Sequence, residues 1–156
     1  MKISGHRSRI ASVKPELIVT STLTVKTPGR GFFDITAEAR DFLREAQAAA
    51  GALTLFVRHT SASLTIQENA DPDVLTDLTD ALDRLAPENG GWIHGSEGPD
   101  DMPAHIKTML TSCSLHVPVE SAEMMLGTWQ GIYLIEHRAA PHRRDIVLQF
   151  IGSVSP

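Results

Sequence analysis

The sequence predicts an α+β fold in which a few helices flank a mostly antiparallel sheet. Strand-like and helix-like segments follow one another irregularly, without the regular strand–helix repeat of a parallel sheet. Three or four strand-like segments come consecutively near the C-terminal end, and such a run could curl into a barrel. The hydrophobic content of 42% and the charged content of 21% are ordinary for a globular protein.

The first third of the chain predicts two strands and a helix. Residues 16–26 are rich in β-branched side chains, which favour a strand. After a glycine-containing turn, residues 32–35 predict a second strand that pairs with the first. Thr36 has the chemistry of a helix N-cap, and the helix is expected to run to about Ala50 and to end at Gly51.

The middle of the chain predicts two more strands, at residues 53–58 and 63–67, and a second helix. Asp71 is placed to cap this helix, with Pro72 as its first residue, because proline is tolerated where no backbone donor is needed. The apolar stripe of the helix ends before Pro87.

A short helix is predicted to start near Pro103, with the upstream aspartates accepting its free backbone N–H groups. Four strands are expected after it, at residues 115–119, 124–126, 131–138 and 145–151.

The composition narrows the class of protein. The 14 basic and 19 acidic residues give a net charge of −5, which argues against a nucleic-acid partner. No apolar run is long enough to cross a membrane and the N-terminus lacks a hydrophobic signal core, so we expect a cytoplasmic protein. We expect one domain over residues 1–156, with residues 1–14 forming a loose segment. The single cysteine, Cys113, is expected to be a small buried apolar residue.

Four of the seven histidines lie in polar, chemically dense segments: His59, His94, His105 and His137. Strand ends and helix starts are where a rigid scaffold presents functional side chains. Neutral imidazole is a common ligand for zinc-like ions, so these histidines either converge on a site or make separate structural hydrogen bonds. The other three, His6, His116 and His142, are expected to be solvated or structural.

Two groups of carboxylates also stand out. Glu68 follows an apolar strand and suits a general base, a partner of a histidine, or half of an ion pair. Asp100 and Asp101 are adjacent like charges, which favours a nearby positive group such as Lys107, an arginine or a metal ion.

A glycine-flanked turn contains Thr128, Trp129 and Gln130. Trp129 could stack on a planar heterocycle that Gln130 hydrogen-bonds. The alternative is a hairpin in which the indole is simply packed.

Three long motifs carry a family resemblance: HTSASLTIQENADPDV at 59–74, HGSEGPDDMPAHIK at 94–107 and LGTWQGIYLIEHR at 126–138. Together they resemble the YjbQ family, also called UPF0047. The resemblance implies a barrel-like α+β fold, a homotrimer and a secondary thiamine-phosphate synthase activity. That reaction joins a pyrimidine pyrophosphate to a thiazole phosphate and releases pyrophosphate.

Under this interpretation one polar pocket acts on a small phosphorylated metabolite, with a divalent metal ion, zinc or magnesium, as cofactor. The expected catalytic residues are His59, Glu68, Asp101, His105 and Arg138. The expected substrate-binding residues are Arg58, Ser61, Asn69, Lys107, Thr128, Trp129 and Gln130, and the expected metal ligands are His94, His105 and His137. The alternatives are a metal-dependent hydrolase or other phosphate-ester enzyme, and a non-catalytic metabolite-binding trimer.

Overall fold

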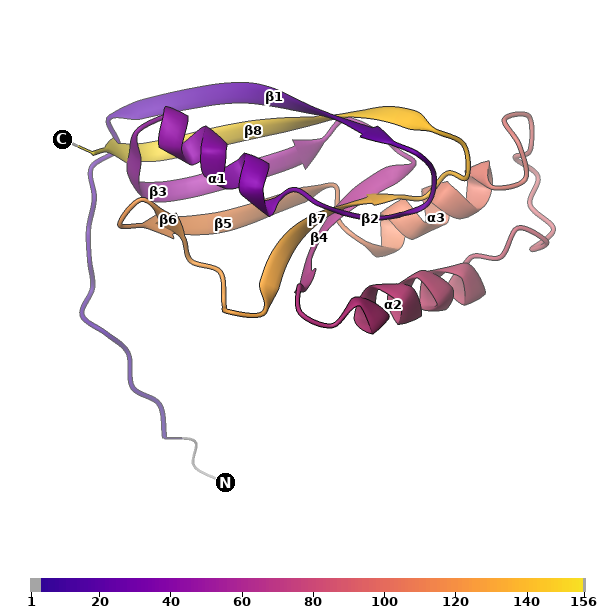
Figure 1. The fold of residues 1–156 in the computed structure, drawn as a ribbon, viewed down its shortest axis with the longest axis horizontal. Coiled ribbons are helices and arrows are strands. Elements are labelled where there is room, and N and C mark those ends of the chain that lie inside the picture. The colour runs from indigo at the N-terminus through magenta and orange to yellow at the C-terminus, as the bar shows by residue number, and fades with distance from the viewer. Residues whose placement is uncertain (1–3, 156) are drawn as a thin grey trace.

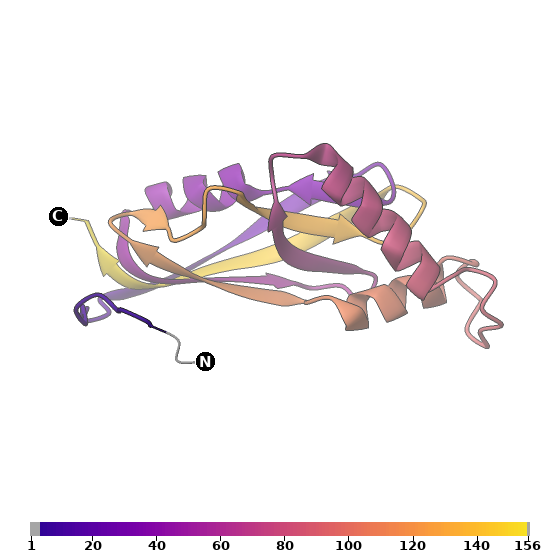
Figure 2. The ribbon, with the colours of Figure 1, turned by 90° about the horizontal axis from the view of Figure 1, so that it is seen from below.

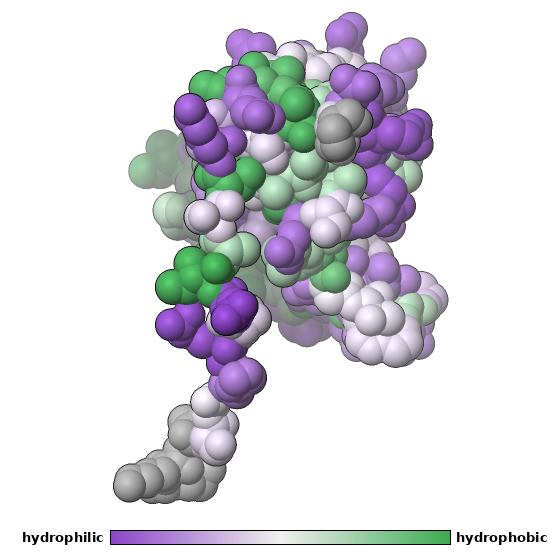
Figure 3. Space-filling model, turned by 90° about the vertical axis from the view of Figure 1, so that its left-hand side faces the viewer, coloured by the Kyte–Doolittle hydropathy of each residue, from purple (hydrophilic) through white to green (hydrophobic). Residues whose placement is uncertain are grey.

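The computed structural model describes residues 4–155 (Figure 1). Residues 4–16 form no helix or strand and are exposed, and they leave the folded part as an extended tail (Figure 1). The segment predicted to be loose, residues 1–14, overlaps this tail over residues 4–14, and residues 1–3 lie outside the described residues. The tail departs from the end of the molecule seen in Figure 3, where apolar and polar side chains are interspersed.

The larger of two sheets has five strands in the order β1-β8-β3-β5-β6, and every pairing is antiparallel. Strand β8 lies between β1 and β3, the first and third strands of the chain. The strands are β1 (Leu17–Thr27), β3 (Ala48–Val57), β5 (Ser114–Glu120), β6 (Glu123–Met124) and β8 (His142–Val154).

The smaller sheet has three strands in the order β2-β7-β4, again antiparallel. They are β2 (Gly31–Asp34), β4 (Ala62–Glu68) and β7 (Gln130–Glu136). Helix α1 (Thr36–Glu45) lies against the strands, and α2 (Pro72–Leu85) and α3 (Asp101–Leu110) lie near each other at one end (Figures 1 and 2). The predicted α+β fold is therefore confirmed, with the antiparallel strands curled into a half-barrel.

One hydrophobic core joins the two sheets and α1. It takes Leu53 and Leu55 from β3, Leu64 from β4, Leu134 from β7 and Phe150 from β8, all fully buried or nearly so. Along β8, inward and outward residues alternate, as expected for a strand with one face on the core. This core holds the ends of β3, β4 and β7, next to which the candidate site lies.

The first predicted helix is shorter than expected. It ends at Glu45, and the alanine-rich stretch after it belongs to β3. Gly51 lies inside that strand. No larger residue fits there, because a Cβ would be only 2.2 Å from the carbonyl oxygen of Ile151 in β8. Close backbone packing, not helix termination, therefore explains this glycine.

Three further local predictions are corrected. Strand β2 pairs with β7, not with β1. Asp100 precedes α3, but its side chain makes no cap hydrogen bond and binds Arg138 and the Ala139 N–H instead. Cys113 is exposed, not buried. None of the helices within residues 4–155 has the length and apolar character needed to cross a membrane.

Candidate metal centre

His94, Asp101 and His105 meet at the N-terminal end of α3. The Nε2 atom of His94 is 2.7 Å from Oδ2 of Asp101, and Nε2 of His105 is 3.4 Å from the same oxygen. One ligand atom from each residue lies within 4.8 Å of the others. Among the described residues this is the group of histidine and acidic side chains close enough to share a metal ion.

Local sequence explains why the three residues meet. Asp101 and His105 are four residues apart on α3, so their side chains lie on one face of the helix, one turn apart. His94 comes from the connection between α2 and α3, which folds back onto the helix start. The Asp101 side chain is 3% exposed whereas the His94 side chain is 42% exposed, so the cluster opens to solvent on the histidine side.

The tautomer of His105 is fixed by its other ring nitrogen. Its Nδ1 lies 3.0 Å from the carbonyl oxygen of Thr60. Because a carbonyl only accepts hydrogen bonds, Nδ1 must carry the proton, and a neutral His105 presents a lone pair on Nε2. Histidine ligands of metals in proteins are commonly oriented in this way.

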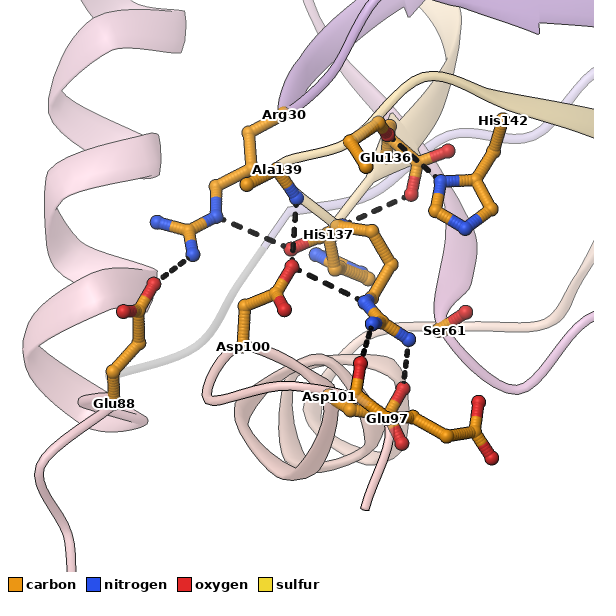
Figure 4. Close-up of polar contacts among 12 residues, drawn as sticks. Arg30, Ser61, Glu88, Glu97, Asp100, Asp101, Glu136, His137, Ala139 and His142 are labelled. Carbon is orange, nitrogen blue, oxygen red and sulfur yellow. Dashed lines mark hydrogen bonds and ion pairs between the residues drawn. The ribbon is translucent and has the colours of Figure 1, made fainter. Parts of the chain in front are cut away.

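Arg138 holds the loop before α3 in place. Its guanidinium donates to Oδ2 of Asp100 at 3.1 Å, to Oδ1 of Asp101, and to the carbonyl oxygen of Glu97 at 2.6 Å. The three acceptors, Asp100, Asp101 and Glu97, lie close together in Figure 4. Burial acts to raise the pKa of Asp100, but the Ala139 N–H and Arg138 hold it below its ordinary value. Arg138 thus orients Asp101 by binding the oxygen that faces away from the histidines.

A buried ion pair between Glu136 and Arg144 adjoins Arg138, whose backbone N–H donates to Glu136. Glu136 accepts from Arg144 at 2.7 Å and 2.5 Å, and the hydroxyl of Thr27 donates to it at 2.7 Å. Burial acts to raise the pKa of Glu136, but the hydrogen bonds from Arg144 and its other donors hold it below its ordinary value. Arg144 also donates to the backbone and hydroxyl of Ser61, so the pair fixes the segment that carries the Thr60 carbonyl.

His137 lies outside the cluster, which corrects the predicted set of metal ligands. It is 2% exposed, and its Nε2 is 2.8 Å from the hydroxyl of Ser63. Burial, with the positive charge of Lys107, lowers the pKa of His137 from 6.5 to about 4. Lys107 does not contact the cluster either, because its nearly buried ammonium pairs with Asp83 of α2. Asp101, and not His137, lies beside His94 and His105.

A second group of predicted residues lies at the far end of the smaller sheet. Glu68 ends β4, a strand of seven residues that starts beside the site, so it stands about 20 Å along the strand from that start. There it joins Asn69, whose N–H donates to the carbonyl of Trp129, and the turn with Thr128 and Gln130. Trp129 is 65% exposed and is not a packed hairpin residue.

Arg58 and His59 flank the cluster without joining it. Both follow β3, and His59 accepts the N–H of Asp145 on Nε2 at 2.9 Å. Sequence reasoning missed Thr60, since a carbonyl leaves no signal in residue type. Asp101 was predicted as a catalytic residue with a positive group such as a metal ion nearby, but it was not grouped with His94 and His105, although its spacing of four residues from His105 in a predicted helix was available.

The family model described as "UPF0047 protein YjbQ-like" matches residues 21–153. The chain belongs to this family. The UPF0047 protein of Synechocystis is 46% identical over 133 residues, which cover 85% of this chain and 90% of that relative. UPF0047 protein YjbQ of Escherichia coli O157:H7 is 42% identical over 132 residues, which cover 84% of this chain and 96% of that relative.

Solved structures show the same fold. A hypothetical protein from Aeropyrum pernix K1 has a TM-score of 0.80 and 28% identity, covering 86% of this chain and 99% of its own. A protein from Sulfolobus solfataricus P2 has a TM-score of 0.78 at 18% identity, covering 88% and 100%, and is described as YbjQ-like and of unknown function.

These names overturn the predicted thiamine-phosphate synthase activity. The UPF0047 relatives carry a family designation without an activity, and nothing in the names points to a thiamine precursor. The geometry agrees with this correction. Trp129 and Gln130, expected to hold a heterocycle, stand at the opposite end of β4 from the histidine cluster within the chain.

Proposed function

We propose that the protein binds a divalent metal ion through His94, Asp101 and His105. The observation that carries the proposal is the hydrogen bond from Nδ1 of His105 to the Thr60 carbonyl, which leaves Nε2 free to bind a cation. Two imidazoles and one carboxylate favour zinc over magnesium, which prefers oxygen ligands.

The distances fit a zinc-sized ion after one small movement. Zinc–ligand bonds of about 2.1 Å in tetrahedral geometry separate two ligand atoms by about 3.4 Å. The 3.4 Å between His105 and Asp101 already matches, whereas His94 is at hydrogen-bond distance from Asp101 and must move outward. Its exposed side chain has room to do so. Arg138 holds the buried carboxylate of Asp101, which is the ligand that both histidines approach.

We propose further that the centre serves the hydrolysis of a phosphate ester of a small metabolite. A bound zinc ion would supply Lewis-acid activation of water and of a phosphoryl oxygen. The protein supplies a carboxylate and two imidazoles held in fixed positions, with an open side at His94 through which a small ligand can enter. Arg138 already donates to three acceptors of its own chain, so we assign it an orienting role, not substrate binding.

The test combines metal analysis with a matched variant. After loading with zinc and desalting, the wild-type protein should retain one zinc per chain, measured by elemental analysis, and should hydrolyse at least one member of a panel of phosphate monoesters. A chelator should abolish both. His105→Ala should lower zinc affinity by tenfold or more, while His116→Ala, an exposed histidine on β5, should not change it. Equal zinc retention in the two variants would remove the proposed centre.

We also propose that the chain assembles as a homotrimer, as the family resemblance implied. The outward face of the larger sheet supports an interface between copies, because Ile18 and Ile151 lie opposite each other on β1 and β8 and are 66% and 39% exposed. Light scattering should give three times the mass of one chain, and Ile18→Lys should give a smaller species. A monodisperse monomer in the wild type would contradict this.

A further inference from the structure

A groove of about 920 Å³ lies beside the histidine cluster and is not used by it. It is formed by the end of β3, the segment after it and the last turns of α3. Its walls are partly apolar and partly polar, and include Phe56, Arg58, His59, Thr108, Met109 and Cys113.

The groove begins where the cluster ends. Thr60 lines it, and the carbonyl oxygen of the same residue accepts the hydrogen bond from His105. On α3, Thr108 and Met109 follow His105 by three and four residues, so all three share one side of the helix. A molecule lying along this side of α3 would touch the groove and the cluster together.

Two side chains in the wall offer hydrogen-bond donors. Arg58 is exposed and makes no ion pair with any residue of the described range 4–155. His59 accepts the Asp145 N–H on Nε2, so its neutral form carries the proton on Nδ1 and remains a donor. Burial and the charge of Arg144 lower the pKa of His59, which favours this neutral form.

A third side chain lacks a partner. The hydroxyl oxygen of Thr108 is buried, and within the described residues it has no hydrogen-bond partner. Buried polar atoms in native proteins are nearly always paired, with protein, water or a ligand. The Thr108 side chain lines the groove, but its hydroxyl oxygen is itself buried, so the polar contacts to an occupant come from Arg58 and His59.

We propose that this groove binds a phosphate monoester of a small apolar or aromatic group. The phosphate lies at Arg58, which is closer to Thr60 along the chain than Phe56 is, and the organic group contacts Phe56 and Met109. Arg58 is the one permanently charged residue among the described lining residues, which suits a single phosphate and not a polyanion. The inference rests on the proposed function only in placing the ester bond toward the metal centre, because binding in the groove needs no metal.

The experiment is calorimetric titration of metal-free protein with phenyl phosphate and with inorganic phosphate. Phenyl phosphate should bind at least tenfold more tightly than inorganic phosphate, because only it reaches the apolar end. Arg58→Gln should weaken phenyl phosphate binding tenfold or more. Arg143→Gln removes a cation on β8 whose side chain is 70% exposed and should leave binding unchanged. Phe56→Ala should reduce the preference for phenyl phosphate over inorganic phosphate.

The results separate the groove from the metal centre. Equal losses in Arg58→Gln and Arg143→Gln, with unchanged melting temperatures, would show only general charge attraction and overturn the inference. Absence of phenyl phosphate binding, together with protection of Cys113 from a thiol reagent in the assembled protein, would mean that a second copy covers the groove, and would also overturn it. If zinc fails to bind but phenyl phosphate binds and depends on Arg58, the groove stands and the proposed metal centre fails.

Discussion

The buried ion pair between Glu136 and Arg144 predicts a large loss of stability when one of its charges is removed alone. Glu136→Gln keeps the size of the side chain but leaves the Arg144 guanidinium, 4% exposed, without a counter-charge. The hydroxyl of Thr27 and the N–H of Arg138 also lose an ionised acceptor, at 2.7 Å and 2.9 Å. The variant therefore tests whether this network stabilises the ends of β7 and β8.

The expected magnitude follows from the burial. Removing one partner of a buried pair costs about 3–5 kcal/mol, since the remaining charge stays desolvated. For a chain of this length each 1 kcal/mol lowers the melting temperature by about 2–4 °C, so the expected fall is roughly 6–20 °C. The pKa of Glu136 lies below its ordinary value, so the contribution of the pair is present at neutral pH and is lost as the pH falls through the folded-state pKa.

Urea unfolding followed by circular dichroism at neutral pH measures the loss. The matched control is Glu123→Gln, whose side chain is 70% exposed and lies 3.9 Å from Arg40. An exposed pair of this kind contributes about 0–1 kcal/mol. The double variant Glu136→Leu with Arg144→Met should recover part of the loss, because no buried charge is then left unpaired.

Refutation is equally specific. If Glu136→Gln costs no more than the Glu123→Gln control, the network does not stabilise the fold as argued. If instead stability falls but zinc affinity is unchanged, the ion pair between Glu136 and Arg144 is not needed to orient the Thr60 carbonyl toward His105.

Three further perturbations have defined outcomes. Burial lowers the pKa of His137 from 6.5 to about 4, so between these pH values the unfolded chain binds a proton more readily than the folded one. Stability should therefore fall as the pH decreases through this range. His137→Gln should reduce this pH dependence, measured as the midpoint of urea unfolding. Asp71→Ala should cost about 1 kcal/mol in thermal unfolding, because Asp71 accepts the Asp73 N–H at 2.9 Å as the cap of α2. Gly51→Ala should cost about 1–3 kcal/mol through the clash with β8, whereas Gly95→Ala, with open space around it, should cost less, as compared by thermal unfolding.

The elements that the sequence predicted well are those set by local chemistry. The second helix begins after Asp71 with Pro72 at its first position, because capping and the missing proline N–H act within a few residues. The stretch from Ala48 to Ala50 was predicted as helix because Gly51 resembles a helix end. Pairing with β8, about one hundred residues further along the chain, makes this stretch a strand, and no local signal reports that partner.

In the candidate site, too, local sequence predicts some residue positions and distant packing partners decide the others. His94, Asp101 and His105 come from one contiguous segment, and their meeting follows from a helix start and a returning loop. The role of His137 depends on how β7 packs against β4, where Ser63 takes its imidazole. Lys107 is removed from the cluster by Asp83, a residue on another helix. Ser63 lies in the first motif and Asp83 in none of the three, and neither pairing has a local sequence signal.

The position of β8 has a consequence for synthesis of the protein. This strand, His142–Val154, lies between β1 and β3 and supplies the hydrogen-bonding partner of both. Until the ribosome has made residues 142–154, the nascent chain carries two long strands with unpaired edges, and such edges pair readily with other chains. The larger sheet therefore closes only after nearly all of these 156 residues have been translated, and aggregation during translation is the hazard that its topology creates.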